Sequence, residues 1–157
     1  MIHPNVERVL AAASDRGLAV EIREFPDGTR TAAEAASAIG VEVGQIVKSL
    51  VFGHDDDVVV ALVSGSNQLD EAALSRLAGG GSVRRVDADA VRAATGYPIG
   101  GVPPFGHART LDTWIDEDLL MFDVVWAAAG TWNHVFAVPP AELVRVTGGQ
   151  VAQLAAR

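Results

Sequence analysis

The chain has 157 residues, no cysteine and a net charge of −8, with a pI of about 4.8. The lack of cysteine excludes disulfides, thiolate catalysis and cysteine-ligated zinc. The acidic balance argues against a protein that wraps nucleic acid, because such binding depends on clustered lysine and arginine, so we expect no DNA partner. Because no apolar run is long enough to cross a bilayer, we expect no membrane partner and a cytoplasmic protein of one domain over residues 1–157.

Helical and alternating apolar patterns share the first half of the chain. Thr31 and Glu34 have the spacing of a capping box, which predicts a helix that begins after Thr31 and ends at Gly40. The segment PDG at 26–28 predicts a turn in front of that helix. The other elements expected here are a helix over 4–16, strands over 20–25, 47–53 and 58–64, a helical turn over 43–46 and a hairpin tip over 54–57.

The second half begins with two helices that have matching start signals. Asp70 and Asp87 are placed as N-caps, and a strand over 82–86 is expected between the two helices. Helices and strands without a regular βαβ rhythm predict an α+β fold, in which helices flank a largely antiparallel or mixed sheet. The remaining elements expected are a β meander over 119–123, 124–130 and 134–138, a helix after Pro139-Pro140, and a further helix announced by a capping box of Thr147 with Gln150.

Lys48 is the only lysine in the chain, whereas the other 11 basic residues are arginines. In an extended strand it shares one face with Ile46, Leu50 and Phe52, and the opposite face is also mainly apolar, as in an interior strand. Its stem can instead lie on the core while the ammonium reaches water, and periodicity alone does not separate these readings. Because burial readily moves the pKa of lysine but not that of arginine, the isolation of Lys48 favours a functional pocket.

The segment GYPIGGVPPFGH at 96–107 is the second distinctive feature, with four glycines and three prolines. Glycine lets backbone N–H groups approach a ligand closely and proline restricts the path of the chain, so such a loop can present amides to a carbonyl oxygen or a phosphate. It lacks the Gly-Lys-Ser/Thr of a Walker loop. A tight crossover between two elements is the other reading, and composition does not reject it.

Other groups in the sequence give weaker signals. The four histidines have no metal-ligand spacing, so we expect no metal site. The arginines at 84, 85 and 92 are expected to be scattered solvated side chains in preference to a patch for a nucleotide end. The segment DED at 116–118 predicts a solvated turn, and the tryptophans at 114, 126 and 132 are expected in the core or at its rim.

Three segments together resemble the YbaK/ProX family, which is related to the editing domain of bacterial prolyl-tRNA synthetases. The resemblance implies an α+β domain whose sheet curls around a pocket. It also implies a deacylase without cofactor or metal that hydrolyses the ester between a wrong amino acid and tRNA. Its partners would be the 3′ end of a mischarged tRNA and a synthetase or an elongation factor. The segments are QIVKSLVF at 45–52, GYPIGGVPPFGH at 96–107 and VVWAAAGTWNHVFAVPPAELVRVTGG at 124–149.

The same resemblance implies the site residues. The lysine that matches Lys48 is the residue most often essential in the family, and the loop that matches 100–106 lines the pocket for the aminoacyl group and the terminal adenosine. Ser49 replaces the asparagine of the alanine-editing branch, and the early-strand tyrosine of the cysteine-editing branch is missing, so neither specificity transfers. The substrate-binding residues implied are Gly100, Gly101, Val102, Pro103, Pro104, Phe105, Gly106, His107, Asn67, Gly130 and Thr131.

The hypothesis for the reaction is attack of water on an ester carbonyl, helped by a ribose hydroxyl of the substrate as proposed for the family. Amides of the loop would stabilise the oxyanion. Lys48 would hold a phosphate or a ribose hydroxyl, stabilise the oxyanion, or act as a base if burial lowers its pKa toward neutrality. Two alternatives stay open: a non-catalytic module that binds an aminoacyl or nucleotide moiety, and an esterase for another small acyl substrate.

Overall fold

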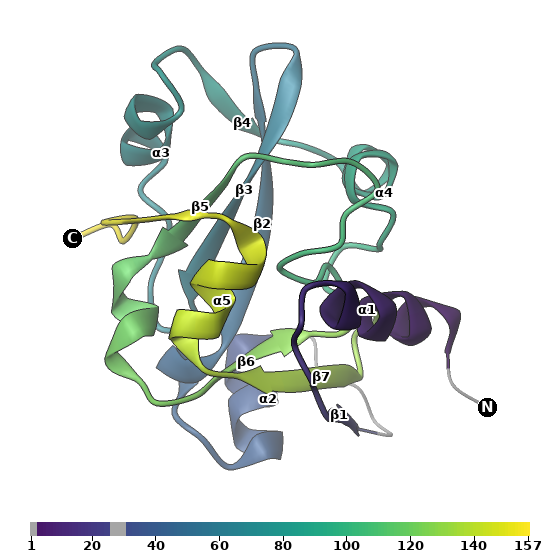
Figure 1. Cartoon of the computed structure of the whole chain (residues 1–157). Coiled ribbons are helices and arrows are strands. Elements are labelled where there is room, and N and C mark those ends of the chain that lie inside the picture. The colour runs from purple at the N-terminus through teal and green to yellow at the C-terminus, as the bar shows by residue number, and fades with distance from the viewer. Residues whose placement is uncertain (1–2, 26–30) are drawn as a thin grey trace.

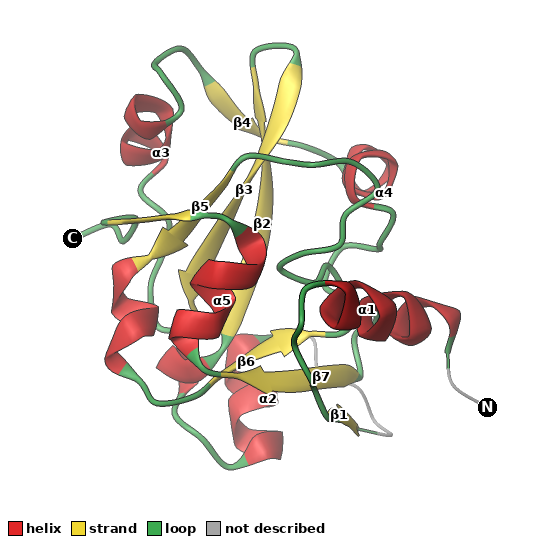
Figure 2. Ribbon diagram, in the orientation of Figure 1, coloured by secondary structure: helices red, strands yellow, loops and turns green. Residues whose placement is uncertain are grey.

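The computed structural model describes residues 3–25 and 31–157, so the turn expected at 26–28 lies outside the described residues. Helices and strands follow one another without a repeating βαβ unit (Figures 1 and 2). In chain order the elements are α1 (Pro4–Asp15), β1 (Ile22–Glu24), α2 (Ala32–Ile39), the 3₁₀ helix η1 (Val43–Gln45), β2 (Val47–His54), β3 (Asp57–Ser64), α3 (Glu71–Leu77), β4 (Val83–Arg85), α4 (Ala88–Thr95), β5 (Thr113–Asp116), the 3₁₀ helix η2 (Glu117–Met121), β6 (Val125–Ala128), β7 (His134–Val138), α5 (Pro140–Thr147) and β8 (Gln150–Ala152).

The expected helix caps are confirmed. The side chains of Thr31, Asp70 and Asp87 each accept a hydrogen bond from the backbone N–H three residues later, at 3.0, 3.1 and 2.8 Å. Each bond satisfies a donor that the first turn of a helix leaves without a partner. Gly40 and Gly96 end α2 and α4 with φ of 87° and 83°, a left-handed conformation that glycine adopts without strain.

The strands form two sheets, one mixed and one antiparallel. The five-stranded sheet has the order β4-β2-β3-β5-β8, in which β3 pairs in parallel with β5 and β5 with β8, whereas β2 is antiparallel to both of its neighbours. The three-stranded sheet has the order β1-β7-β6 and runs across the lower end of β2 in Figure 1. A bridge between Ile46 and Trp126 joins the two sheets. The α+β fold with a mixed sheet is confirmed, although the expected single sheet is divided in two.

The first strand of the expected meander, at 119–123, is wrong. These residues belong largely to η2, and the strand lies just before it, as β5. Within the apolar run LLM only Leu119 is buried, because Leu120 and Met121 are 42% and 81% exposed. The backbone N–H of Asp118 donates to the carboxylate of Asp116 at 3.0 Å, which starts the helical turn. A short apolar run thus resembles a strand although only one of its side chains enters the core.

The helix expected from Thr147 and Gln150 is also wrong. The hydroxyl of Thr147 donates back to the carbonyl of Leu143 at 2.8 Å, so this side chain closes α5 and does not begin another helix. Gly148 then ends α5 with φ of 65°. The residues that follow form β8, whose parallel pairing with β5 has no local signal in the sequence.

Two apolar cores lie on opposite faces of the five-stranded sheet. The larger core contains Val47 and Val51 of β2 together with buried residues of α1, α4 and α5. The smaller core contains Phe52 of β2 and Leu74 of α3. Because side chains alternate along a strand, Ser49 lies on the face of the larger core and Lys48 on the face of the smaller one. The two residues therefore belong to different faces of one strand.

Candidate active site

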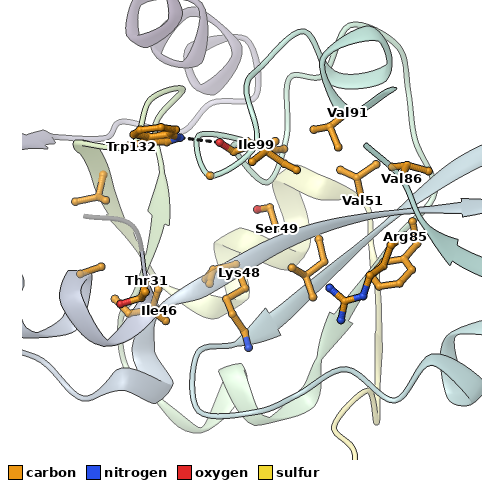
Figure 3. A pocket seen from close by; sticks show the side chains of 18 residues that line it. Thr31, Ile46, Lys48, Ser49, Val51, Arg85, Val86, Val91, Ile99 and Trp132 are labelled. Atoms are coloured by element: carbon orange, nitrogen blue, oxygen red, sulfur yellow. Dashed lines mark hydrogen bonds between the residues drawn. The ribbon is translucent and has the colours of Figure 1, made fainter. Parts of the chain in front are cut away.

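A cavity of about 440 Å³ opens along one edge of β2. β4 pairs only with the last three residues of β2, so the stretch between the Ile46–Trp126 bridge and Phe52 is left uncovered on that side. Side chains from both faces of β2 therefore line one cavity (Figure 3). Its lining consists of residues 46–52, together with Thr31, Ala32, Ala35, Arg85, Val86, Val91, Ile99, Gly100, Val102, Trp132 and Val135.

Lys48 lines this cavity and is partly buried in it. Its ammonium donates a hydrogen bond to the backbone carbonyl of Asn67, and in Figure 3 it points away from Ile99 and Trp132. Burial lowers the pKa of Lys48 from its usual value of 10.5, while the negative charge of Asp116 raises it in part. The cavity thus contains a cation that gives up its proton more readily than a lysine in water.

The negative charge of Asp116 acts on Lys48 from the interior of the protein. The burial of Asp116 differs from the solvated turn expected at 116–118. Asp116 is fully buried, and its carboxylate accepts hydrogen bonds from the backbone N–H of Ser64 at 3.0 Å and from the side-chain amide of Asn67 at 2.9 Å. The expectation is wrong for Asp116 because β5 lies beside β3 and carries this residue into the sheet. Asn67 does not line the cavity with its side chain. Instead, its backbone carbonyl accepts from Lys48 while its side-chain amide donates to the buried carboxylate, so the residue links the two.

The glycine–proline loop faces the cavity only through its first part. Gly100 and Val102 line the cavity, and Ile99 between α4 and these residues does so as well. Gly101 turns to the other side, where an added Cβ would lie 2.9 Å from the backbone of Gly130 and of Thr131. The loop therefore rests directly on the 130–131 turn, which explains the need for a glycine between two cavity-lining residues.

The later residues of the loop pack inward and do not line the cavity. Phe105 is buried in the larger core, with its ring 5.8 Å from that of Phe136. Pro103, Pro104 and Gly106 accompany it into the interior or against α1. The ring Nε2 of His107 lies 2.7 Å from the carbonyl of Pro103, and burial lowers the pKa of this histidine. This half of the loop anchors the half that faces the cavity.

The 130–131 turn lies behind the loop and outside the cavity lining. The carbonyl of Gly130 accepts from the side-chain amide of Asn5 at 2.9 Å, and the hydroxyl of Thr131 lies 2.5 Å from Nδ1 of His134. Nε2 of His134 is 2.8 Å from a carboxylate oxygen of Glu24, so the turn is fixed to β1 and β7. The 130–131 turn contributes to the cavity by holding the glycine–proline loop in position.

Several residues that line the cavity were not among the site residues implied by the sequence, although the expected rim position of Trp132 is confirmed. Trp132 is 45% exposed at the rim, and its indole N–H donates to the carbonyl of Ile99 at 2.7 Å. Ser49 and Arg85 also line the cavity. The sequence marked Ser49 only as a departure from a family pattern, and it favoured a solvated side chain for Arg85 over a place in a patch for a nucleotide end. The sequence offered one signal for each of these residues, its neighbourhood. Ser49 follows Lys48, Arg85 lies in the strand expected at 82–86, and Trp132 follows the 130–131 turn.

Replacement of Gly101 by alanine is expected to lower the free energy of unfolding by about 1–3 kcal/mol, because the new methyl group would overlap a rigid backbone. Chemical denaturation measures the change. Gly53→Ala is a matched control, since the three atoms nearest to its Cβ would all belong to the side chain of Arg84, the closest 2.8 Å away, and this side chain is exposed and can move. Equal stability of the two variants would contradict the proposed fit of the loop on the turn.

Within 3–25 and 31–157, no three histidine or carboxylate side chains come together as a metal site would require. In the same part of the chain, no helix is both long and apolar enough to cross a membrane.

The chain belongs to the family of the aminoacyl-tRNA editing domain, whose pattern matches residues 26–146. A crystal structure provisionally assigned as a trans-editing enzyme for prolyl-tRNA synthetase is 47% identical, with a TM-score of 0.95 over 100% of both chains. A protein of Enterococcus faecalis, provisionally named Cys-tRNA(Pro)/Cys-tRNA(Cys) deacylase EbsC, is 29% identical over 125 residues, 79% of this chain and 76% of that one. The proline--tRNA ligase of Nitratidesulfovibrio vulgaris is 36% identical over 118 residues, 73% of this chain but 21% of the ligase. The family resemblance of the sequence is thus confirmed.

Proposed function

We propose that the chain works as one editing domain that hydrolyses, in trans, the ester between a wrong amino acid and tRNA. The observation that carries the proposal is that Lys48 and Gly100 line the same cavity at the open edge of β2. A cation and a glycine loop in one cavity can hold an ester and stabilise the negative charge that forms on its carbonyl oxygen. Family membership and the name of the solved relative support the same activity.

The reaction follows from the groups that line the cavity. Water attacks the ester carbonyl, negative charge forms on its oxygen, and the bond to the ribose oxygen of tRNA then breaks. The ammonium of Lys48 either binds the terminal phosphate or a ribose hydroxyl, or stabilises the oxyanion, and the backbone at Gly100 supplies further dipoles. Among residues 3–25 and 31–157, no histidine or carboxylate lines the cavity to act as a base, and in this scheme a ribose hydroxyl of the substrate assists the water. No metal takes part in this scheme.

The substrate is proposed to be tRNA-Pro that carries a small amino acid. The names of the similar proteins refer to prolyl-tRNA synthetase and to Cys-tRNA(Pro), which favours this tRNA. A cavity of about 440 Å³ has to hold the terminal adenosine as well as the amino acid, which favours a small side chain. The net charge of −8 predicts weak binding of tRNA alone, so a synthetase or an elongation factor would deliver the substrate in the cytoplasm.

The test is deacylation of tRNA-Pro charged with alanine, serine, cysteine or proline. We expect the wild-type protein to cleave at least one mischarged form faster than Pro-tRNA-Pro, and to keep its rate after dialysis against EDTA. Absence of turnover for the whole panel would contradict the proposal. If a non-hydrolysable aminoacyl-adenosine still bound under those conditions, the protein would be a binding module and not a hydrolase.

A further inference from the structure

Ser49 places a hydroxyl group in the cavity on the face of β2 opposite to Lys48. Its Oγ is buried and has no hydrogen-bond partner in the described part of the protein. Figure 3 shows the side chain directed toward the side of Ile99, while Lys48 points the other way. A buried hydroxyl without a partner is unfavourable, and native proteins seldom keep one without a reason. The position of this hydroxyl in the cavity lining therefore favours a ligand that pairs with it.

A comparison with Trp114 separates Ser49 from an ordinary packing defect. Its Nε1 is the other buried side-chain atom without a partner among residues 3–25 and 31–157. Trp114 belongs to the smaller core and does not line the cavity, so no ligand can reach it there. Of these two atoms, only Oγ of Ser49 is placed where a substrate can complete its hydrogen bonds.

Several aliphatic side chains accompany Ser49 on its side of the cavity. Val51, Val91 and Val102 line the cavity and belong to the larger core, which lies on the face of β2 that carries Ser49. Lys48 and Arg85 lie on the other side in Figure 3. A single hydroxyl among aliphatic side chains can distinguish a small polar group from a methyl group of similar size. Such a site discriminates because a substrate without the polar group leaves the protein hydroxyl unpaired.

The backbone of Ser49 is available for a different part of the substrate. The backbone N–H of Gly65 donates to the carbonyl of Ile46 at 2.7 Å, which sets the phase of the antiparallel ladder between β2 and β3. In an antiparallel ladder, residue pairs that exchange backbone hydrogen bonds alternate with pairs that do not. The even-numbered residues of β2 therefore hydrogen-bond to β3, whereas Ser49 directs its N–H and carbonyl to the uncovered edge. These groups can bind the main-chain atoms of an aminoacyl ester and leave Oγ for the side chain of the amino acid.

We propose that Ser49 makes the site selective for a small amino acid that carries a side-chain hydroxyl, serine or threonine, over alanine. The inference rests on the proposed deacylation of mischarged tRNA. The hydroxyl of the amino acid pairs with Oγ of Ser49, and the three valines surround the rest of the side chain. Alanine is smaller, because it lacks the hydroxyl group, and it leaves Oγ of Ser49 without a partner.

The kinetic test compares Ser-tRNA-Pro, Thr-tRNA-Pro and Ala-tRNA-Pro. For the wild-type protein we expect a kcat/KM for the hydroxylated substrates roughly 10-fold above that for alanine. The variant Ser49→Ala should lose this preference, while Ser37→Ala, an exposed serine on α2, should keep it. An equal loss for all substrates in Ser49→Ala, or an unchanged preference, would overturn the proposal.

A binding test decides the question without catalysis. The probes are adenosines that carry serine or alanine through a 3′ amide, and calorimetry gives the Kd of each. We expect the seryl compound to bind more tightly to the wild-type protein and the two Kd values to converge in Ser49→Ala. Equal Kd values for the wild-type protein overturn the proposal, even where mischarged tRNA is cleaved. Conversely, a protein that cleaves no mischarged tRNA but shows the expected Kd ratio refutes deacylation and supports the role of Ser49.

Discussion

Replacement of Lys48 by alanine is expected to lower kcat/KM for deacylation by about 100-fold or more. Loss of one preoriented group that stabilises an oxyanion typically has this effect. Lys48 is the only lysine of the chain, and its ammonium stands half-buried in the cavity, where electrostatic interactions are stronger than in water. Single-turnover kinetics with the best mischarged tRNA measure the change. Arg76→Ala, which removes an exposed cation on α3, should leave the rate unchanged.

The pH dependence then distinguishes the roles of Lys48. Burial lowers its pKa below 10.5, so the ammonium loses its proton at a lower pH than an exposed lysine does. If the ammonium binds a phosphate or the oxyanion, kcat/KM falls as the pH rises through this lowered pKa. If the neutral amine acts as a base, kcat/KM rises over the same range. Because arginine stays charged throughout, Lys48→Arg should remove an alkaline fall and should be inactive under the second role.

Activity of Lys48→Ala close to that of the wild type would contradict any catalytic or binding role of this side chain. Circular dichroism and a denaturation curve of the variant exclude unfolding as the cause of a loss. The cost to stability should be small, because the side chain makes one hydrogen bond, to the carbonyl of Asn67, and is only partly buried.

The sequence predicted those parts of the site that depend on local patterns. Lys48 was identified by its isolation and by apolar residues on both faces of its strand, and it does line the cavity. The glycine–proline loop was identified by composition, but composition does not say which side of a loop faces a ligand. Its residues 103–107 pack inward because Phe105 fits the larger core. The family resemblance supplied the substrate class, which no spacing in the chain implies.

Pairing between distant segments accounts for what the sequence could not predict. The cavity is open because β4 pairs with only three residues of β2. The sequence around Ser49 does not show where this pairing stops. The burial of Asp116 depends on the parallel pairing of β5 with β3, about 50 residues earlier in the chain. A local reading of three acidic residues in a row favours solvent, and the contacts of Asp116 with Ser64 and Asn67 become visible only in three dimensions.

Removal of the Asp116 carboxylate is expected to lower the free energy of unfolding by about 3 kcal/mol or more and the Tm by roughly 6–12 °C. In Asp116→Ala the backbone N–H groups of Ser64 and Asp118 lose their acceptor, and the side-chain amide of Asn67 keeps only its hydrogen bond to Asp118. Calorimetry measures the change. Glu117→Ala is the matched control, because Glu117 is the next residue along the chain but is exposed. Similar Tm values for the two variants would contradict the structural role of the buried carboxylate.

Asp116→Asn separates the charge of this group from its hydrogen bonds. The amide keeps one oxygen to accept from Ser64 or Asn67, so the loss of stability should be smaller than in the alanine variant. The negative charge that raises the pKa of Lys48 is nevertheless gone, and burial then lowers that pKa without opposition. The pH at which Lys48 loses its proton should therefore fall further below 10.5, and the pH profile of deacylation should move with it. An unmoved profile in a folded Asp116→Asn protein would show that this carboxylate holds Asn67 in place without acting on the charge of Lys48.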